Sequence, residues 1–182
     1  RRVFERGLGE PTGFVLPIVR VQGKSGPEWQ TGMWMLRSRH LFLVPGDSPV
    51  GLRLPLASLP WEPADQVRQV WTIDPMAPAE PLPVTLNQRK LETPFAPPAS
   101  GAPPAGGLVR TALAVEPRDG RLCVFLPPAS SAADYIELIT AIEATAAQLK
   151  MPVLVEGYTP PYDSRLREIK VTPDPGVIEV NV

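Results

Sequence analysis

Proline is the residue that most constrains how this chain can fold. It accounts for 25 of the 182 residues, about 14% where an average protein has about 5%. Eleven of these prolines lie between Pro60 and Pro104, among Ala, Gly and Ser. Because proline lacks a backbone N–H and fixes φ, such a stretch forms neither a long helix nor a central strand. We therefore expect residues 74–107 to be a Pro/Ala/Gly-rich connector, either a free linker or a strap packed over a domain surface.

Before this connector, residues 1–73 are expected to form a small β-rich region. Aromatic and β-branched residues dominate there, and the turn-forming run at residues 45–49 separates apolar segments. The expected strands lie at residues 13–20, 29–37, 41–44 and 51–56.

After the connector, residues 108–182 show a clearer pattern. Strands expected at 108–116 and 121–126 flank the loop from Pro117 to Gly120. This loop favours an antiparallel hairpin, because Gly120 can take a positive φ. Three more strands are expected at residues 152–156, 166–171 and 177–182.

A helix is predicted between the second and third of these strands. Ser131 and Asp134 resemble a capping box that begins a helix reaching about Lys150. Apolar residues then recur at helical spacing and form one stripe, which we expect to pack on the sheet. The predicted fold is therefore α+β, with a mostly antiparallel sheet and one long amphipathic helix in the order ββαβββ.

Composition narrows the classes of function. The 18 Lys and Arg residues balance 19 Asp and Glu, so we expect no nucleic-acid partner. The longest apolar runs fall far short of the roughly 20 residues that span a bilayer, so we expect no membrane partner. Cys123 has no second cysteine to pair with and no signal peptide opens the chain, which favours a cytoplasmic location. Arg1 and Val182 look like cut ends, so we expect an internal fragment.

Three residue patterns that invite a chemical reading have simpler explanations. Gly23-Lys24-Ser25 resembles the end of a phosphate-binding loop, but Ile18 occupies the position of the required glycine, so we predict a turn. His40 is the only histidine, which excludes a two-histidine metal site. Cys123 has no histidine nearby in the sequence and is expected to be a packing residue rather than a nucleophile.

Carboxylates are the remaining candidates for chemistry. Strand alternation places Glu179 and Asn181 on one face of the last strand, which is either a solvated face or a site. Glu116 and Glu156 end two other predicted strands. Three acids near a common sheet would suit Mg²⁺, which prefers oxygen ligands.

Residues 46–56, 115–120 and 170–181 resemble the corresponding segments of a family of very large bacterial amidoligases. The resemblance covers nearly the whole chain. Members join a transglutaminase-like domain to a region similar to glutamine synthetases and carboxylate-amine ligases. The resemblance therefore implies the start of a glutamine-synthetase-like half-barrel, with ATP and Mg²⁺ as cofactors. It also implies a small-molecule or peptide carboxylate and an amine as substrates, and the other domains of the parent protein as partners.

At one position the resemblance extends to a functional residue of the family. Glutamine synthetases have a Gly-Gln-x-Glu strand whose Glu binds metal, and Gly176 to Glu179 is similar, with Val177 in place of the Gln. A second metal-binding Glu of that motif corresponds here to Val171. The resemblance assigns no catalytic residue. Its implied metal ligands are Glu179, Glu116 and Asn181, and its implied phosphate-binding residues are Arg53, Arg118 and Lys170.

Two other functions remain open on the sequence alone. The chain could be a non-catalytic module that binds a peptide or a neighbouring domain, as the Pro-rich connector and the scarcity of paired catalytic groups suggest. Alternatively, it could accompany a transglutaminase-type peptide-processing activity whose catalytic residues lie elsewhere in the parent protein.

Overall fold

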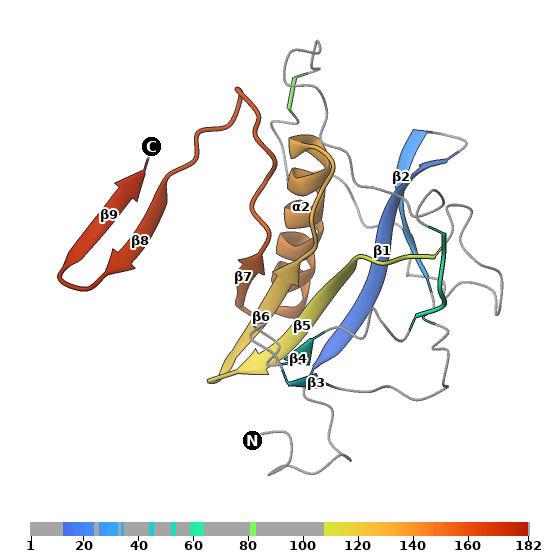
Figure 1. The fold of residues 1–182 in the computed structure, drawn as a ribbon, viewed down its shortest axis with the longest axis horizontal. Coiled ribbons are helices and arrows are strands. Elements are labelled where there is room, and N and C mark those ends of the chain that lie inside the picture. The colour runs from blue at the N-terminus through green and yellow to red at the C-terminus, as the bar shows by residue number, and fades with distance from the viewer. Residues whose placement is uncertain are drawn as a thin grey trace.

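A five-stranded sheet with one helix across it forms the main body of the chain (Figure 1). The computed structural model describes residues 13–23, 26–32, 34, 44–45, 52–53, 59–63, 81–82 and 108–181. The strands are β1 (Phe14–Gly23), β2 (Gly26–Thr31), β3 (Val44–Pro45), β4 (Leu52–Arg53), β5 (Ala112–Arg118), β6 (Arg121–Leu126), β7 (Val153–Gly157), β8 (Lys170–Asp174) and β9 (Val177–Asn181), and the helix is α2 (Ala132–Leu149).

The main sheet has the strand order β2-β1-β5-β6-β7. All neighbouring strands pair antiparallel except β6 and β7, which are parallel and are connected through α2. The predicted α+β class, with one helix and a mostly antiparallel sheet, is confirmed. Pairing of β1 with β5 joins strands from the two sides of the predicted connector, which lies outside the described residues apart from 81–82.

The hairpin of β5 and β6 has a tighter turn than the sequence suggested. Pro117 and Arg118 belong to β5, and only Asp119 and Gly120 form the turn. Their φ angles of 52° and 76° are both positive, as a two-residue type I′ turn requires. This turn matches the twist of the strands, so β5 continues two residues past the predicted end at Glu116.

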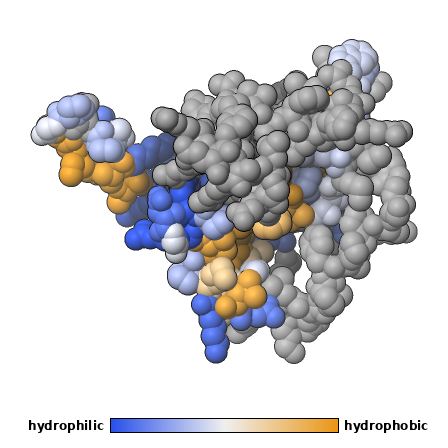
Figure 2. Space-filling view, turned by 90° about the horizontal axis from the view of Figure 1, so that it is seen from below, coloured by the Kyte–Doolittle hydropathy of each residue, from blue (hydrophilic) through white to orange (hydrophobic). Residues whose placement is uncertain are grey.

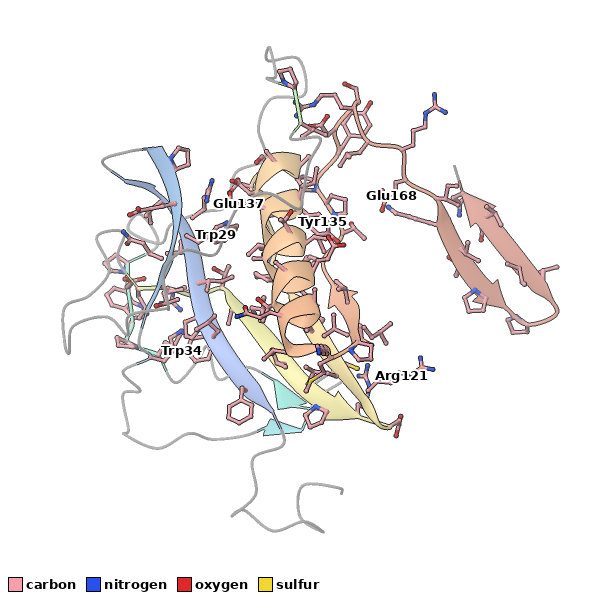
Figure 3. All side chains as sticks on the ribbon, turned by 180° about the vertical axis from the view of Figure 1, so that it is seen from behind. Trp29, Trp34, Arg121, Tyr135, Glu137 and Glu168 are labelled. Atoms are coloured by element: carbon pink, nitrogen blue, oxygen red, sulfur yellow. The ribbon has the colours of Figure 1, made fainter. Side chains whose placement is uncertain are left out.

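Helix α2 begins and ends as its sequence predicts. The Ser131 side chain accepts a hydrogen bond of 3.1 Å from the backbone N–H of Asp134, which satisfies one N–H that has no partner within the helix. At the other end Lys150 takes a left-handed conformation, and its N–H donates to the carbonyls of Ala146 and Ala147. The helix covers one face of the sheet, as Figures 1 and 3 show from opposite sides.

The core lies between this helix and the sheet. It is centred on Ile18 of β1, Leu126 of β6 and Leu138 of α2, with partly buried apolar neighbours around them. Arg20 ties the same layers together, since its Nε lies 2.9 Å from Asp134 Oδ1 and its Nη2 lies 2.8 Å from Glu137 Oε2. Its guanidinium also lies 5.5 Å from the ring centroid of Trp29. Figure 3 shows Trp29 and Glu137 near each other.

Strands β8 and β9 form a separate two-stranded hairpin that projects from the body (Figure 1). We call this hairpin the arm. One of its faces carries exposed apolar side chains, and Figure 2 shows them gathered along one side of the arm. Tyr135 lies on α2, and its pKa is raised by burial and by the carboxylate of Glu168, a residue just before β8 (Figure 3). The idea that this hairpin continues a glutamine-synthetase-like half-barrel stays a prediction. The apolar face comprises Val171, Pro173, Ile178 and Val180.

The strands predicted before the connector are described only in part. Strand β1 extends to Gly23, which pairs with Gly26 of β2, while residues 24–25 of the predicted turn lie outside the described residues. Of the segments predicted at 41–44 and 51–56, the structure describes the paired residues of β3 and β4. His40 lies outside the described residues. Within the described ranges, no helix has the length and apolarity needed to cross a bilayer.

Candidate functional site

A charged cluster lies on the face of the main sheet that points away from α2. Leu113 packs into the core beneath the helix, so alternation along β5 places Glu116 and Arg118 on the opposite face. Cys123 pairs directly with Glu116, and the next strand brings Glu156 onto the same face. Three neighbouring strands therefore place these four side chains together.

Arg118 is at the centre of this cluster. Its Nη2 donates hydrogen bonds to Glu156 Oε1 and, over 3.2 Å, to Cys123 Sγ, while its Nη1 lies 4.0 Å from Glu116 Oε2. The side chains of Arg118, Glu116 and Glu156 are 27%, 17% and 22% exposed, so water reaches the cluster only partly. We call these three residues the Glu–Arg–Glu cluster.

Electrostatic effects on Arg118 oppose one another. Desolvation lowers its pKa, but the charges of Glu156 and Glu116 and the hydrogen bond to Glu156 raise it, and the net pKa is raised. The guanidinium therefore stays positively charged and compensates the neighbouring carboxylates. Glu156 keeps a second oxygen, Oε2, which is shielded from solvent and accepts no hydrogen bond.

The cysteine in this cluster has the environment of a packing residue. Cys123 is a free thiol with 4% of its surface exposed. Since a thiol needs both access and an activating base to act as a nucleophile, this burial agrees with the packing role predicted from the sequence.

A second polar group lies on the exposed arm. Glu179 and Asn181 share one face of β9, and the Asn181 amide nitrogen donates to Glu179 Oε1 over 3.1 Å. Across the hairpin, Thr172 pairs with Glu179 and Lys170 pairs with Asn181. The Lys170 ammonium also lies 3.4 Å from Glu168 Oε2. This polar face of the hairpin opens to solvent along its length.

The structure thus divides the residues predicted from the sequence into two groups. Glu116 and Arg118 meet in the Glu–Arg–Glu cluster, whereas Glu179, Asn181 and Lys170 lie together on the arm. The expectation of three acids on a common sheet fails for Glu179, because β8 and β9 pair with each other instead of joining the main sheet. Arg53 is in β4, and its side chain lies outside the described part.

No three His, Cys, Asp or Glu side chains of the described part come close enough together to hold a metal ion. The metal and phosphate roles inferred from the resemblance therefore remain predictions.

Sequence reasoning missed the contact between Arg118 and Glu156. These residues are 38 positions apart, and only the parallel pairing of β6 with β7 brings them together. The signal that could have found it is the strand–helix–strand pattern from 121 to 157, because such a crossover places its two strands parallel and commonly adjacent.

Comparison with known proteins identifies a family. A family model described as "Putative amidoligase enzyme (DUF2126)" matches residues 1–182. No curated protein and no solved structure matches the chain.

Proposed function

The chain belongs to the amidoligase enzyme family DUF2126, and from this premise we propose that it forms part of an ATP-dependent carboxylate–amine ligase. The match across residues 1–182 is the observation that carries this proposal. In the proposed reaction an oxygen of the carboxylate substrate attacks the γ-phosphorus of ATP, and ADP leaves. The amine nitrogen then attacks the acyl carbon, the amide forms, and phosphate and a proton are released.

The polar face of the arm fits part of a magnesium site. Mg²⁺ is commonly held by one or two protein carboxylates, with phosphate and water oxygens completing its shell. Glu179 offers a carboxylate, and Asn181 offers its amide oxygen because its nitrogen already donates to Glu179. When bound, Mg²⁺ would neutralise phosphate charge. Lys170, directly across the hairpin from Asn181, would turn its exposed ammonium from Glu168 to a phosphate oxygen bound there.

The Glu–Arg–Glu cluster has a different part in this proposal. The Arg118 guanidinium is already engaged by Glu156 and lies near Glu116, so its positive charge is largely compensated. A compensated cation attracts phosphate weakly, because the neighbouring carboxylates repel the same anion. We assign Arg118 the role of holding the two carboxylates in place.

A binding module without catalysis is the competing function. The exposed apolar face of the arm favours it, since Val171 is 60% exposed and Ile178 is 73% exposed. Contiguous exposed apolar surface is typical of protein interaction sites.

Calorimetric titration of Mg²⁺ into this chain, with and without a non-hydrolysable ATP analogue, tests the ligase proposal. Glu179→Gln removes one proposed ligand without changing the side chain's size. We expect it to weaken metal-dependent nucleotide binding by at least the roughly 10- to 100-fold that loss of an outer-shell partner causes. Glu143→Gln, the same change at an exposed position of α2, is the matched control.

Two results separate the competing functions. Binding that is lost in Glu179→Gln but retained in Glu143→Gln supports a metal–nucleotide site on the arm. A parent protein that yields neither ADP nor amide from Mg-ATP and a broad mixture of carboxylates and amines would falsify the ligase proposal and leave the binding module.

A further inference from the structure

Strand β7 is an open edge of the main sheet. It pairs with β6 on one side, and no described strand pairs with it on the other. Apolar side chains are exposed on both of its faces, at Leu154 and Val155, and Leu149 and Met151 are exposed where α2 leads into it. An exposed apolar edge of this kind is a template for another strand. The outer edge of β7 is therefore an interaction surface that the described part of the chain leaves uncovered.

The backbone of β7 directs two residues to this edge. The Tyr158 N–H donates to the Leu126 carbonyl over 3.2 Å, in step with the parallel pairing of β6 and β7. Backbone groups alternate in direction along a strand, so the N–H and C=O groups of Glu156 also point to β6. Those of Val153 and Val155 therefore point to the open edge.

The arm has a free edge of its own. Asp174 and Val177 pair with each other across the two-residue turn, and hydrogen-bonded and non-hydrogen-bonded pairs alternate from there. Pro173 then has a non-hydrogen-bonded position, so its missing N–H faces the outer edge of β8 and hinders strand pairing there. On β9 the same alternation directs the N–H and C=O groups of Ile178 and Val180 outward. The outer edge of β9 is therefore the pairing edge of the arm.

The edges of β7 and β9 match in backbone direction and in side-chain character. Antiparallel pairing that places Ile178 opposite Val155 also places Val180 opposite Val153, with their outward backbone groups facing one another. Val155 is on the sheet face that α2 covers, because it pairs with the buried Val124 of β6. The pairing therefore continues this face of the main sheet with the apolar face of the arm.

Charge and polarity select this register among its neighbours. It places Val177 opposite Glu156 and Glu179 opposite Leu154. A shift of two residues in one direction would place Glu179 directly opposite Glu156, and like charges directly opposite each other destabilise a strand pair. The same shift in the other direction would move Val180 past the start of β7. A shift of one residue would turn the apolar face of the arm to the other side of the sheet.

We propose that two copies of this chain exchange their arms, with β9 of each copy pairing antiparallel to β7 of the other. Figure 1 shows β7 and β9 pointing the same way within one chain, so antiparallel pairing within that chain requires the arm to turn round. A two-fold axis between two copies reverses the partner's β9 without this change. Each copy supplies one β7 edge and one arm, so the exchange closes as a dimer. It is independent of the ligase reaction.

Engineered cysteines test the pairing directly. A chain with Val155→Cys is mixed with a chain with Ile178→Cys and oxidised mildly. The Cα atoms of opposite hydrogen-bonded residues are about 5.5 Å apart, which suits a disulfide. We expect the mixture to give a cross-linked dimer on non-reducing electrophoresis and each variant alone to give none. Cross-linking of Ile178→Cys alone to the same extent would show that the arms pair with each other and would overturn the proposal.

The double variant with Val155→Cys and Ile178→Cys separates exchange from closure within one chain. We expect it to give cross-linked dimers. A disulfide formed within a monomer would place the arm on its own body and overturn the exchange.

Sedimentation over a series of concentrations measures the assembly of the unaltered chain. We expect a monomer–dimer equilibrium that approaches twice the 19.8 kDa of one chain. Ile178→Lys is expected to weaken the dimer at least about tenfold, because it removes a large apolar side chain from the pairing. Phe14→Lys, the same kind of change at an exposed position of β1, is the control. A chain that stays monomeric throughout, an open-ended series of larger species, or an equal loss in both variants contradicts the proposal.

Discussion

Replacing Gly157 by alanine should cost more stability than the same change at any other described glycine with a positive φ. Gly157 has a φ of 104°, and holding a residue with a side chain in a sparsely populated region costs about 1–3 kcal/mol. The added Cβ would also lie 2.5 Å from Leu126 O and 2.6 Å from Leu126 N. These are backbone atoms, which cannot rotate away, and such overpacking costs about 1–3 kcal/mol more. The expected total is roughly 2–6 kcal/mol, out of about 5–15 kcal/mol for a typical domain.

Two other glycines isolate the steric part of this cost. Gly120 and Gly176 have φ angles of 76° and 84°, but a Cβ at either meets nothing within 4 Å. Gly120→Ala and Gly176→Ala should therefore show only the backbone cost. Urea unfolding followed by circular dichroism compares the three variants, with unchanged m-values as the check that the unfolded states are equivalent. If Gly157→Ala is no more destabilised than Gly120→Ala, the close approach of β6 and β7 is not a source of strain and the reasoning is refuted.

The remaining predictions concern the helix start and a surface turn. Ser131→Ala should lower the free energy of unfolding by about 1 kcal/mol, because the backbone N–H of Asp134 loses its hydrogen bond to the Ser131 hydroxyl. Urea unfolding measures the change, with Ser130→Ala as the control. An equal loss in both variants would argue against the cap. Asp163, held by hydrogen bonds from Arg165, has its pKa lowered from 3.8 to about 2, so its contribution to turn stability is complete above pH 3.8 and is lost as pH falls through about 2. An NMR titration of the Asp163 carboxyl should show this low pKa, and Arg165→Gln should return it towards 3.8; an ordinary pKa in the unaltered chain would contradict the pairing.

Local features of the fold could be predicted from the sequence because their causes lie within a few residues. The Ser131 cap and the turn at Gly120 each depend on side chains or φ preferences that the sequence states directly. The exact ends of the strands were harder to predict, because Pro117 is compatible with both a strand and a turn. The turn needs only Asp119 and Gly120, so Pro117 belongs to β5.

Contacts across the sheet could not be predicted in the same way. Arg118 has several carboxylates within reach in principle, and strand order alone selects Glu156. The same limitation affected Glu179. Strand alternation predicted that Glu179 and Asn181 share one face of the last strand, but the sequence did not show which sheet that strand joins. Side-chain type therefore indicated the candidates, while their grouping depended on pairings between distant segments.

The pairing of β1 with β5 also determines the order in which this protein can fold. Thr111 and Ile18, which join these strands by hydrogen bonds, are 93 residues apart, so a long loop must close before they meet. Residues 112–157 instead form β5, β6, α2 and β7 from one continuous segment. Because local contacts form faster than distant ones, this segment should acquire protected amides first, and β1 should dock afterwards. Until it does, β5 presents an unpaired edge, so the interval before β1 docks is when a nascent chain is most exposed to pairing with another copy.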